Sequence, residues 1–205
     1  MAVLSTKQIE RHTPAHRESD PVPPVYLIAP MDIVQKARWR SALAREGVTG
    51  YPSEEDLARA VREAVEEVAP ANLAECLEAV DVWLGLLAAP PLEPLPEGQE
   101  EDEERREAVA RRRAALDAYA AVERAMSVHP RVSSIRAERV LFGDIAPSLA
   151  AAYALRGWEN VKVEFKLVNG VVPLYVLGEL DENDLRDVGY KAMSLLRVSE
   201  TERKN

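Results

Sequence analysis

The stretch VYLIAPMDIVQKARWRSALAREG, residues 25–47, joins two unlike elements at a junction that can be read from sequence. Its first four residues are β-branched, aromatic or aliphatic and lie between two proline-containing pairs, which predicts one short strand. A helix is expected to follow, because Asp32 suits an N-cap and Gly47 stands where a glycine in the left-handed conformation ends a helix. This stretch therefore predicts a strand followed directly by a helix.

Trp39 lies inside the expected helix, close to the basic residues Lys36, Arg38 and Arg40. Two interpretations of this helix are open. Trp39 packs in a small core, or the helix presents Trp39 and Arg38 to a partner. The core interpretation is preferred for Trp39, because a tryptophan at helical spacing is more often packed than displayed.

The composition favours helix packing over a β-rich core. Hydrophobic residues make up 47% of the chain and charged residues 30%, as in ordinary globular proteins, but aromatic residues make up 5% and much of the apolar content is alanine. The sequence shows no membrane-spanning run and no apolar leader, so a cytoplasmic protein without membrane contact is expected. Cys76 is the single cysteine and is expected to be a buried, unreactive thiol.

The net charge of -9 is unevenly distributed. Residues 51–104 hold most of the excess acid, whereas residues 105–160 carry ten arginines against six acids. Nonspecific nucleic-acid binding is not expected of so acidic a chain. The arginine-rich segment 105–113 keeps one alternative open, a helical regulatory protein that binds nucleic acid.

Proline and charge divide the sequence into four predicted segments. These are a flexible arm over 1–24, a strand plus helical module over 25–88, a Pro/acid-rich linker over 89–104, and a second helical module over 105–205. In the first module Ser53 and Asp56 have capping-box spacing, and the apolar positions of two successive helices predict a helical hairpin.

The end of the chain changes character. Residues 131–156 predict two helical pieces joined at Gly143-Asp144, with Pro147 in the first turn of the second piece and Gly157 as its C-cap. Residues 161–167 alternate apolar with charged side chains, and Asn169-Gly170 then signals a hairpin turn before 171–177. A final helix is expected, capped by Asp181 or Asn183. The fold class predicted is mainly α, with helical hairpin modules, a short N-terminal strand and a small C-terminal β-hairpin plus helix.

No pattern for catalysis is present in the sequence. It contains no phosphate-binding glycine loop, no GxSxG, no HExxH and no paired Cys/His spacing. His12 and His16 have a spacing that suits a metal on a helix, but Pro14 stands between them and no third ligand is near in sequence. We therefore expect a non-enzymatic assembly or binding protein with no catalytic, cofactor-binding or metal site.

Two stretches, residues 23–47 and 153–205, give the chain a resemblance to the tail assembly chaperones of long-tailed bacteriophages. The first is the strand, proline and helix described above. In the second, RGW at residues 156–158 precedes the expected hairpin, the helix DLRDVGYKAM and the polar end SETERKN.

The resemblance implies a non-enzymatic chaperone in the host cytoplasm. It would bind and solubilise the long helical tape-measure protein, or another phage tail protein, during tail morphogenesis, and self-association is left open. The residues expected to contact the partner are Trp39, Arg38, Trp83, Leu84 and Trp158. The alternative is a structural connector or completion protein that is retained in the phage particle.

Overall fold

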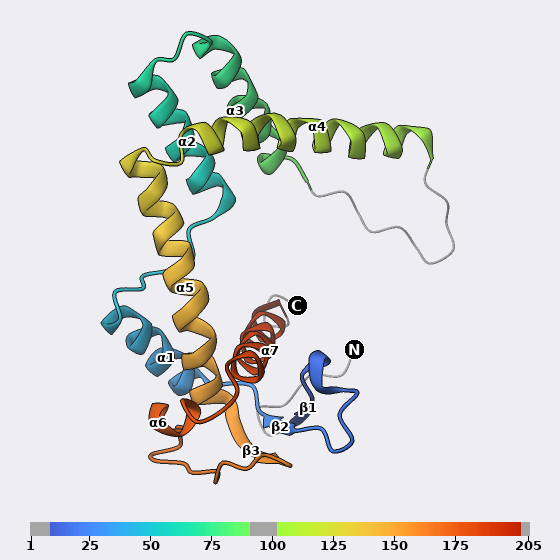
Figure 1. Ribbon diagram of the computed structural model, residues 1–205, viewed down its shortest axis with the longest axis vertical. Coiled ribbons are helices and arrows are strands. Elements are labelled where there is room, and N and C mark those ends of the chain that lie inside the picture. Colours follow the sequence, from blue (N-terminus) through green and yellow to red (C-terminus); the bar gives the residue numbers. More distant parts are fainter. Residues whose placement is uncertain (1–8, 91–101, 202–205) are drawn as a thin grey trace. The chain divides into compact units, whose positions relative to one another are not determined.

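The computed structural model describes residues 9–90 and 102–201. The chain is mainly α, as predicted, and divides into two compact units: unit 1 contains residues 1–50 and 141–205, and unit 2 contains residues 51–140. Figure 1 shows that unit 1 combines the blue and the orange-to-red segments, which come from the two ends of the sequence. Unit 2 is therefore an insertion in the sequence of unit 1.

The unit boundaries differ from the segments predicted from sequence. Helix α3, Leu73–Ala88, and helix α4, Glu103–Ala125, lie on either side of the predicted linker yet pack on each other within unit 2. Residues 91–101 of that linker lie outside the described part of the chain. Glu103 and Glu104 belong to the first turn of α4 behind the N-cap Asp102, where acidic side chains favour a helix.

Unit 1 contains a three-stranded antiparallel sheet with the order β1-β2-β3. The predicted strand is confirmed as β2, Val25–Ile28, which lies in the centre between β1, Glu10–His12, and β3, Leu155–Glu159. Tyr26 and Ile28 of β2 are buried in the core of this unit. The first strand after the proline-rich segment thus supplies both backbone pairing and core side chains.

Part of the predicted flexible arm is ordered. Residues 1–8 are not described, but β1 pairs with β2, Pro14 is buried, and a short 3₁₀ helix, η1, covers Ala15–Arg17. The guanidinium of Arg11 donates hydrogen bonds of 2.7 and 2.6 Å to the carboxylate of Glu159, which lowers the pKa of that carboxyl. Without β1, the backbone groups along one edge of β2 would lack partners. This requirement explains why part of the predicted flexible arm is ordered.

The helix expected after β2 is α1, Ile33–Arg45. The backbone amide of Gln35 donates to the Asp32 carboxylate at 2.7 Å, and the backbone amide of Asp32 donates to the side-chain oxygen of Gln35 at 3.1 Å. Gly47 adopts a φ of 77°, as its expected place beyond the helix end requires. Both predicted ends of this helix are confirmed.

The prediction of two helical pieces over 131–156 is wrong. One helix, α5, runs over Pro130–Ala154 with Pro147 inside it, contributing residues 130–140 to unit 2 and the remainder to unit 1. The chain then enters β3 directly, so Gly157 lies in a strand rather than at a helix cap. Packing of the small residues Ala150, Ala151 and Ala152 in the core of unit 1 offsets the loss of a helix hydrogen bond at the proline.

The hairpin predicted after α5 forms only at its turn. Val168 and Val171 make an isolated bridge around Asn169 and Gly170, whose φ angles are 54° and 78° as a type I′ turn requires. No described residue of 161–167 belongs to a strand, and residues 174–177 form the short helix α6, Leu174–Leu177. The alternation of apolar and charged residues over 161–167 still marks which side chains are partly buried, because Val161, Val163 and Phe165 pack against the core.

The last helix, α7, covers Glu182–Thr201. The carboxylate of Asp181 accepts hydrogen bonds from the backbone amides of Asn183, at 3.0 Å, and Asp184, at 3.2 Å, so Asp181 is the cap. Buried Val188, Ala192 and Leu195 of α7 join the core of unit 1. The predicted capped helix at this end of the chain is confirmed.

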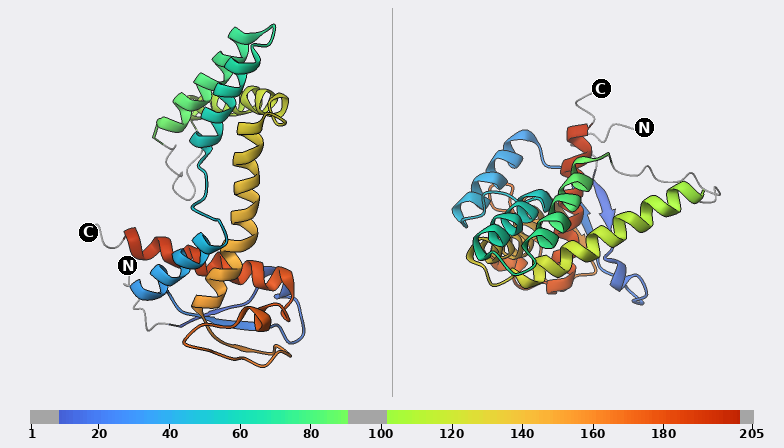
Figure 2. Two further views of the ribbon diagram at one scale, coloured as in Figure 1. Left: turned by 90° about the vertical axis from the view of Figure 1, so that its left-hand side faces the viewer. Right: turned by 90° about the horizontal axis from the view of Figure 1, so that it is seen from above.

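Unit 2 is helical. Its first helix, α2, covers Glu54–Val68 behind the predicted capping box of Ser53 and Asp56, and α2 and α3 lie side by side as the expected hairpin (Figure 2). Both pack with α4 around a core that includes Val61, Cys76 and Trp83. The burial of Cys76, at 9% exposed, confirms the expected buried thiol.

Candidate functional site

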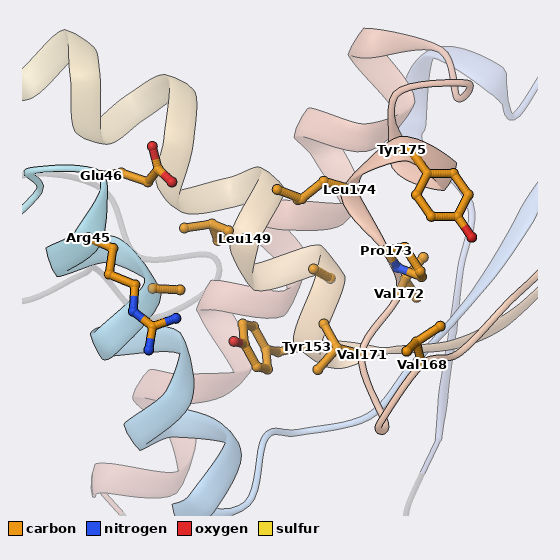
Figure 3. A pocket seen from close by; sticks show the side chains of 12 residues that line it. Arg45, Glu46, Leu149, Tyr153, Val168, Val171, Val172, Pro173, Leu174 and Tyr175 are labelled. Atoms are coloured by element: carbon orange, nitrogen blue, oxygen red, sulfur yellow. The ribbon is translucent and has the colours of Figure 1, made fainter.

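Unit 1 carries an apolar groove with a volume of about 450 Å³. Three parts of the unit form it: the end of α1, the last two turns of α5, and the segment around α6. Figure 3 shows the side chains that line it, with Arg45 and Glu46 on one side and Val168 and Tyr175 on the other. The complete lining consists of Ala42, Arg45, Glu46, Leu149, Ala152, Tyr153, Val168, Val171, Val172, Pro173, Leu174 and Tyr175.

The wall opposite α1 is held in place by backbone hydrogen bonds. The turn at Asn169-Gly170 returns the chain, and the amide of Val172 donates to the carbonyl of Ala152 at 2.9 Å. Pro173 is the N-cap residue of α6, in extended conformation. This arrangement attaches residues 168–175 to the end of α5, so the groove is bounded by connected backbone rather than by side chains alone.

Apolar surface dominates the groove. Val168, Leu174 and Tyr175 are 46%, 57% and 62% exposed at its rim, while Val172 beneath them is fully buried. The polar groups of the lining are the charged side chains of Arg45 and Glu46 and the hydroxyls of Tyr153 and Tyr175, and the other lining residues are apolar. Such a surface suits the apolar side chains of a ligand or a partner protein.

The helix that borders the groove is basic. Between its bounds α1 contains Lys36, Arg38, Arg40 and Arg45 and no acidic residue. Arg38 is exposed and lies four residues before Ala42 of the groove lining, hence on the same side of the helix. Negative charge on a partner would therefore be favoured beside the apolar surface.

Of the residues expected to contact a partner, Trp39 is packed in unit 1. It is 9% exposed, and its indole Nε1 donates to the carbonyl of Ala146 at 3.4 Å. This burial confirms the core interpretation of Trp39. Arg38, beside it in sequence, is exposed next to the groove, and its contact with a partner stays a prediction.

Trp83 and Leu84 belong to unit 2. Trp83 is 7% exposed and stacks on Tyr119, with ring centroids 5.8 Å apart and an interplanar angle of 19°. Leu84 is partly buried against the same core. Neither lines the groove, because the lining residues all belong to unit 1.

Trp158 lies on β3 and is half-buried. Its ring packs edge-on against Phe165, with centroids 4.8 Å apart, and its Nε1 donates to the carbonyl of Val163 at 2.7 Å. These contacts explain how the residues after β3 stay on the core without strand pairing. Trp158 therefore has a packing role, and its surface is not part of the groove.

The groove is not apparent from the sequence. The sequence predicts that Leu174 and Tyr175 belong to the hairpin segment 171–177 and that Leu149 and Tyr153 belong to the second helical piece of 131–156. One local signal was present. Pro173 confines any strand at this place to the edge of a sheet, and a short edge strand cannot bury both of the large apolar residues that follow the proline. The groove itself depends on the meeting of residues 42–46 with residues 149–175, which are distant in sequence.

Comparison of the chain with protein-family models, with curated proteins and with solved structures found no match. Within the described residues, no helix has both the length and the apolar character that crossing a bilayer requires.

Proposed function

We propose that this chain is a non-enzymatic tail assembly chaperone of a long-tailed bacteriophage, which binds the tape-measure protein in the host cytoplasm and keeps it soluble. The observation that carries the proposal is the apolar groove, with Leu174 and Tyr175 exposed at its rim. Its volume of about 450 Å³ lies within the range of about 300–1,000 Å³ common for binding pockets. A client that exposes apolar stripes before assembly needs such a partner surface.

The client segment that fits best is an amphipathic helix. A helix laid in a groove contributes apolar side chains from positions i, i+3, i+4 and i+7. The basic side of α1, with Arg38 and Arg45, would face acidic residues at the edge of that apolar stripe. Apolar contact would supply most of the affinity, and the charges would orient the helix and speed its association.

A charged side chain in the groove should prevent client binding. Val168→Glu and Leu174→Glu each place a carboxylate where an apolar side chain of the client would be buried. Burial of one such side chain contributes about 1.5–3 kcal/mol, so we expect each variant to bind the tape-measure protein about 10- to 100-fold more weakly. Co-expression followed by co-purification and titration of the purified pair measures this loss.

Val128→Glu is the matched control for these variants. Val128 is 88% exposed in unit 2 and does not line the groove, so this variant should bind the client normally. Equal binding by the groove variants and the control would exclude the groove as the client site. A tape-measure protein that is soluble alone and forms no complex with the wild-type chain would contradict the proposed function itself.

Charge reversal on α1 should act mainly on the association rate. Arg38→Glu is expected to slow association several-fold and to make the rate less dependent on salt, because rim charges steer encounter more than they hold a complex. Stopped-flow mixing at two ionic strengths gives both quantities. Arg113→Glu on α4 of unit 2 is the control, and an equal effect of both variants would show that net charge, not Arg38, determines the rate.

The alternative role, a connector or completion protein in the particle, uses the same surface differently. A chaperone releases its client and is absent from purified particles, whereas a connector remains. Mass spectrometry of purified particles therefore separates the two roles, once binding through the groove has been measured.

A further inference from the structure

Asp184, in the first turn of α7, is a buried carboxylate with one oxygen that lacks a hydrogen bond. It is 4% exposed and is the one charged residue found buried among the described side chains. Its Oδ2 accepts a hydrogen bond of 3.0 Å from the hydroxyl of Tyr26, whereas its Oδ1 accepts none. Since a buried carboxylate is costly unless it is compensated, the groups that face Oδ1 decide how this charge is balanced.

His16 and Asp181 face the same point. The Nε2 atom of His16 lies 2.9 Å from Oδ1 of Asp184, and one ligand atom from each of the three residues lies within 4.8 Å of the others. The two atoms lie within ion-pair distance, but no hydrogen bond joins them. Two ligand atoms about 2.1 Å from one tetrahedrally coordinated ion are about 3.4 Å apart and point at the ion rather than at each other.

We propose that His16, Asp181 and Asp184 bind one divalent transition-metal ion of the Zn²⁺ class. One imidazole nitrogen with two carboxylate oxygens suits such an ion, whereas Mg²⁺ and Ca²⁺ prefer all-oxygen sites. His16 and Asp181 are exposed, so small rotations of their side chains can bring all three ligand atoms to coordination distance. Three protein ligands leave room for water to complete the coordination.

The surroundings of the three residues fit this assignment. Tyr26 fixes the carboxylate of Asp184 through Oδ2, as the outer partner of a metal ligand does. A cavity of about 290 Å³ adjoins Tyr26, Asp181 and Asp184 and gives space for water ligands. Arg17 and Lys162 also line this cavity. The Nε of Arg17 donates to Asp20 at 2.7 Å, and its guanidinium also attracts the carboxylates of Asp184 and Asp181, so a bound ion would share these negative charges with Arg17.

The bound ion would connect the two ends of the sequence. His16 is in η1, near the N-terminus, while Asp181 and Asp184 are at the start of α7. An ion held by all three would fix the N-terminal segment on α7 and stabilise unit 1. This inference is independent of client binding, because none of the three residues lines the apolar groove.

Zinc titration of the full chain tests the proposal. After treatment with EDTA and its removal, isothermal titration with ZnCl₂ should give one site per chain, and Zn²⁺ at about 100 times its Kd should raise the Tm by on the order of 10 °C. His16→Gln and Asp181→Asn each remove a ligand at an exposed position, and the asparagine keeps a cap oxygen for α7. Each should weaken binding by about 100-fold or more, and Tyr26→Phe by about 10-fold.

His129→Gln and His12→Gln are the controls. His129 is in unit 2, and His12 faces Asp187 at 3.6 Å, outside the proposed ligand set, so both variants should bind Zn²⁺ as the wild type does. Binding that survives in His16→Gln, or that is lost in His12→Gln, would overturn the assignment. The absence of any Zn²⁺ response in the wild type, with a lower Tm in His16→Gln, would identify a direct His16–Asp184 ion pair instead.

Discussion

Replacement of Gly189 by alanine is expected to destabilise unit 1 by about 3 kcal/mol or more. Helix α7 crosses α5 at this residue so closely that a Cβ on Gly189 would lie 2.3 Å from the carbonyl oxygen of Pro147, 2.5 Å from its carbonyl carbon and 2.6 Å from its Cβ. These are atoms of the backbone and of a rigid ring, and both residues are buried, so one helix has to move. Overpacking of a core costs about 1–3 kcal/mol or more, and the three short contacts place this variant at the upper end.

Urea denaturation followed by circular dichroism measures the change in the free energy of unfolding. Gly85→Ala is the control, because Gly85 is an exposed residue of α3 with no atom within 4 Å of its added Cβ. Alanine is the better helix former, so this variant should be more stable by about 0.5–1 kcal/mol. Wild-type stability of Gly189→Ala would show that α5 and α7 do not approach each other as described.

Removal of the indole at position 83 should destabilise unit 2 by about 3–5 kcal/mol. Trp83 is buried and stacked on Tyr119, and truncation of such a side chain to alanine loses its buried apolar area and leaves a cavity. The loss should appear in Trp83→Ala as faster amide hydrogen exchange within residues 51–140. Val82→Ala, next to it in sequence and 47% exposed, should change the stability by less than about 0.5 kcal/mol.

The same variant separates a packing role from a contact role. If Trp83 is a core residue only, substitutions in the groove should change the affinity for the proposed client, whereas Trp83→Ala should not. A Trp83→Ala protein with wild-type stability and lost client binding would instead make Trp83 a contact residue. Co-purification assays on the variant that also report its unfolding curve distinguish these results.

Local patterns predicted three helix starts and two turns well, but not the ends of the helix over Pro130–Ala154. The capping residues Asp32, Ser53 and Asp181 all accept the backbone hydrogen bonds expected of them. Gly47 and the Asn169-Gly170 turn adopt the positive φ angles that their residue types favour. These features are decided by groups a few residues apart, so a single stretch of sequence contains the whole cause.

Backbone pairing was predicted less well. The alternation over 161–167 reports correctly that one side of the segment is buried, but a strand also needs a neighbour with free backbone groups. That neighbour, β2, pairs instead with residues 155–159 and with residues 10–12. Pro147 misled for a related reason, since tertiary packing retains α5 through a residue that isolated helices avoid.

The two candidate sites could not be predicted from the sequence, because they too depend on contacts between distant segments. The spacing of His12 and His16 was the one metal-related signal in the sequence, and no metal site was expected from it, because the proposed co-ligands Asp181 and Asp184 are near the other end of the chain. The groove likewise combines α1 with residues 149–175. Only contacts between distant residues create either site.

The sequence by itself determined a mainly α chain, the caps at Asp32, Ser53 and Asp181, the turn at Asn169-Gly170, the strand β2 and the burial of Trp39 and Cys76. Each of these follows from propensity, periodicity or a side chain that bonds to nearby backbone. The tertiary structure alone decided that 51–140 is inserted in the other unit, that β1 and β3 flank β2, and that the groove and the His16 cluster exist. Those features depend on which distant surfaces bury each other, and no local pattern specifies that pairing.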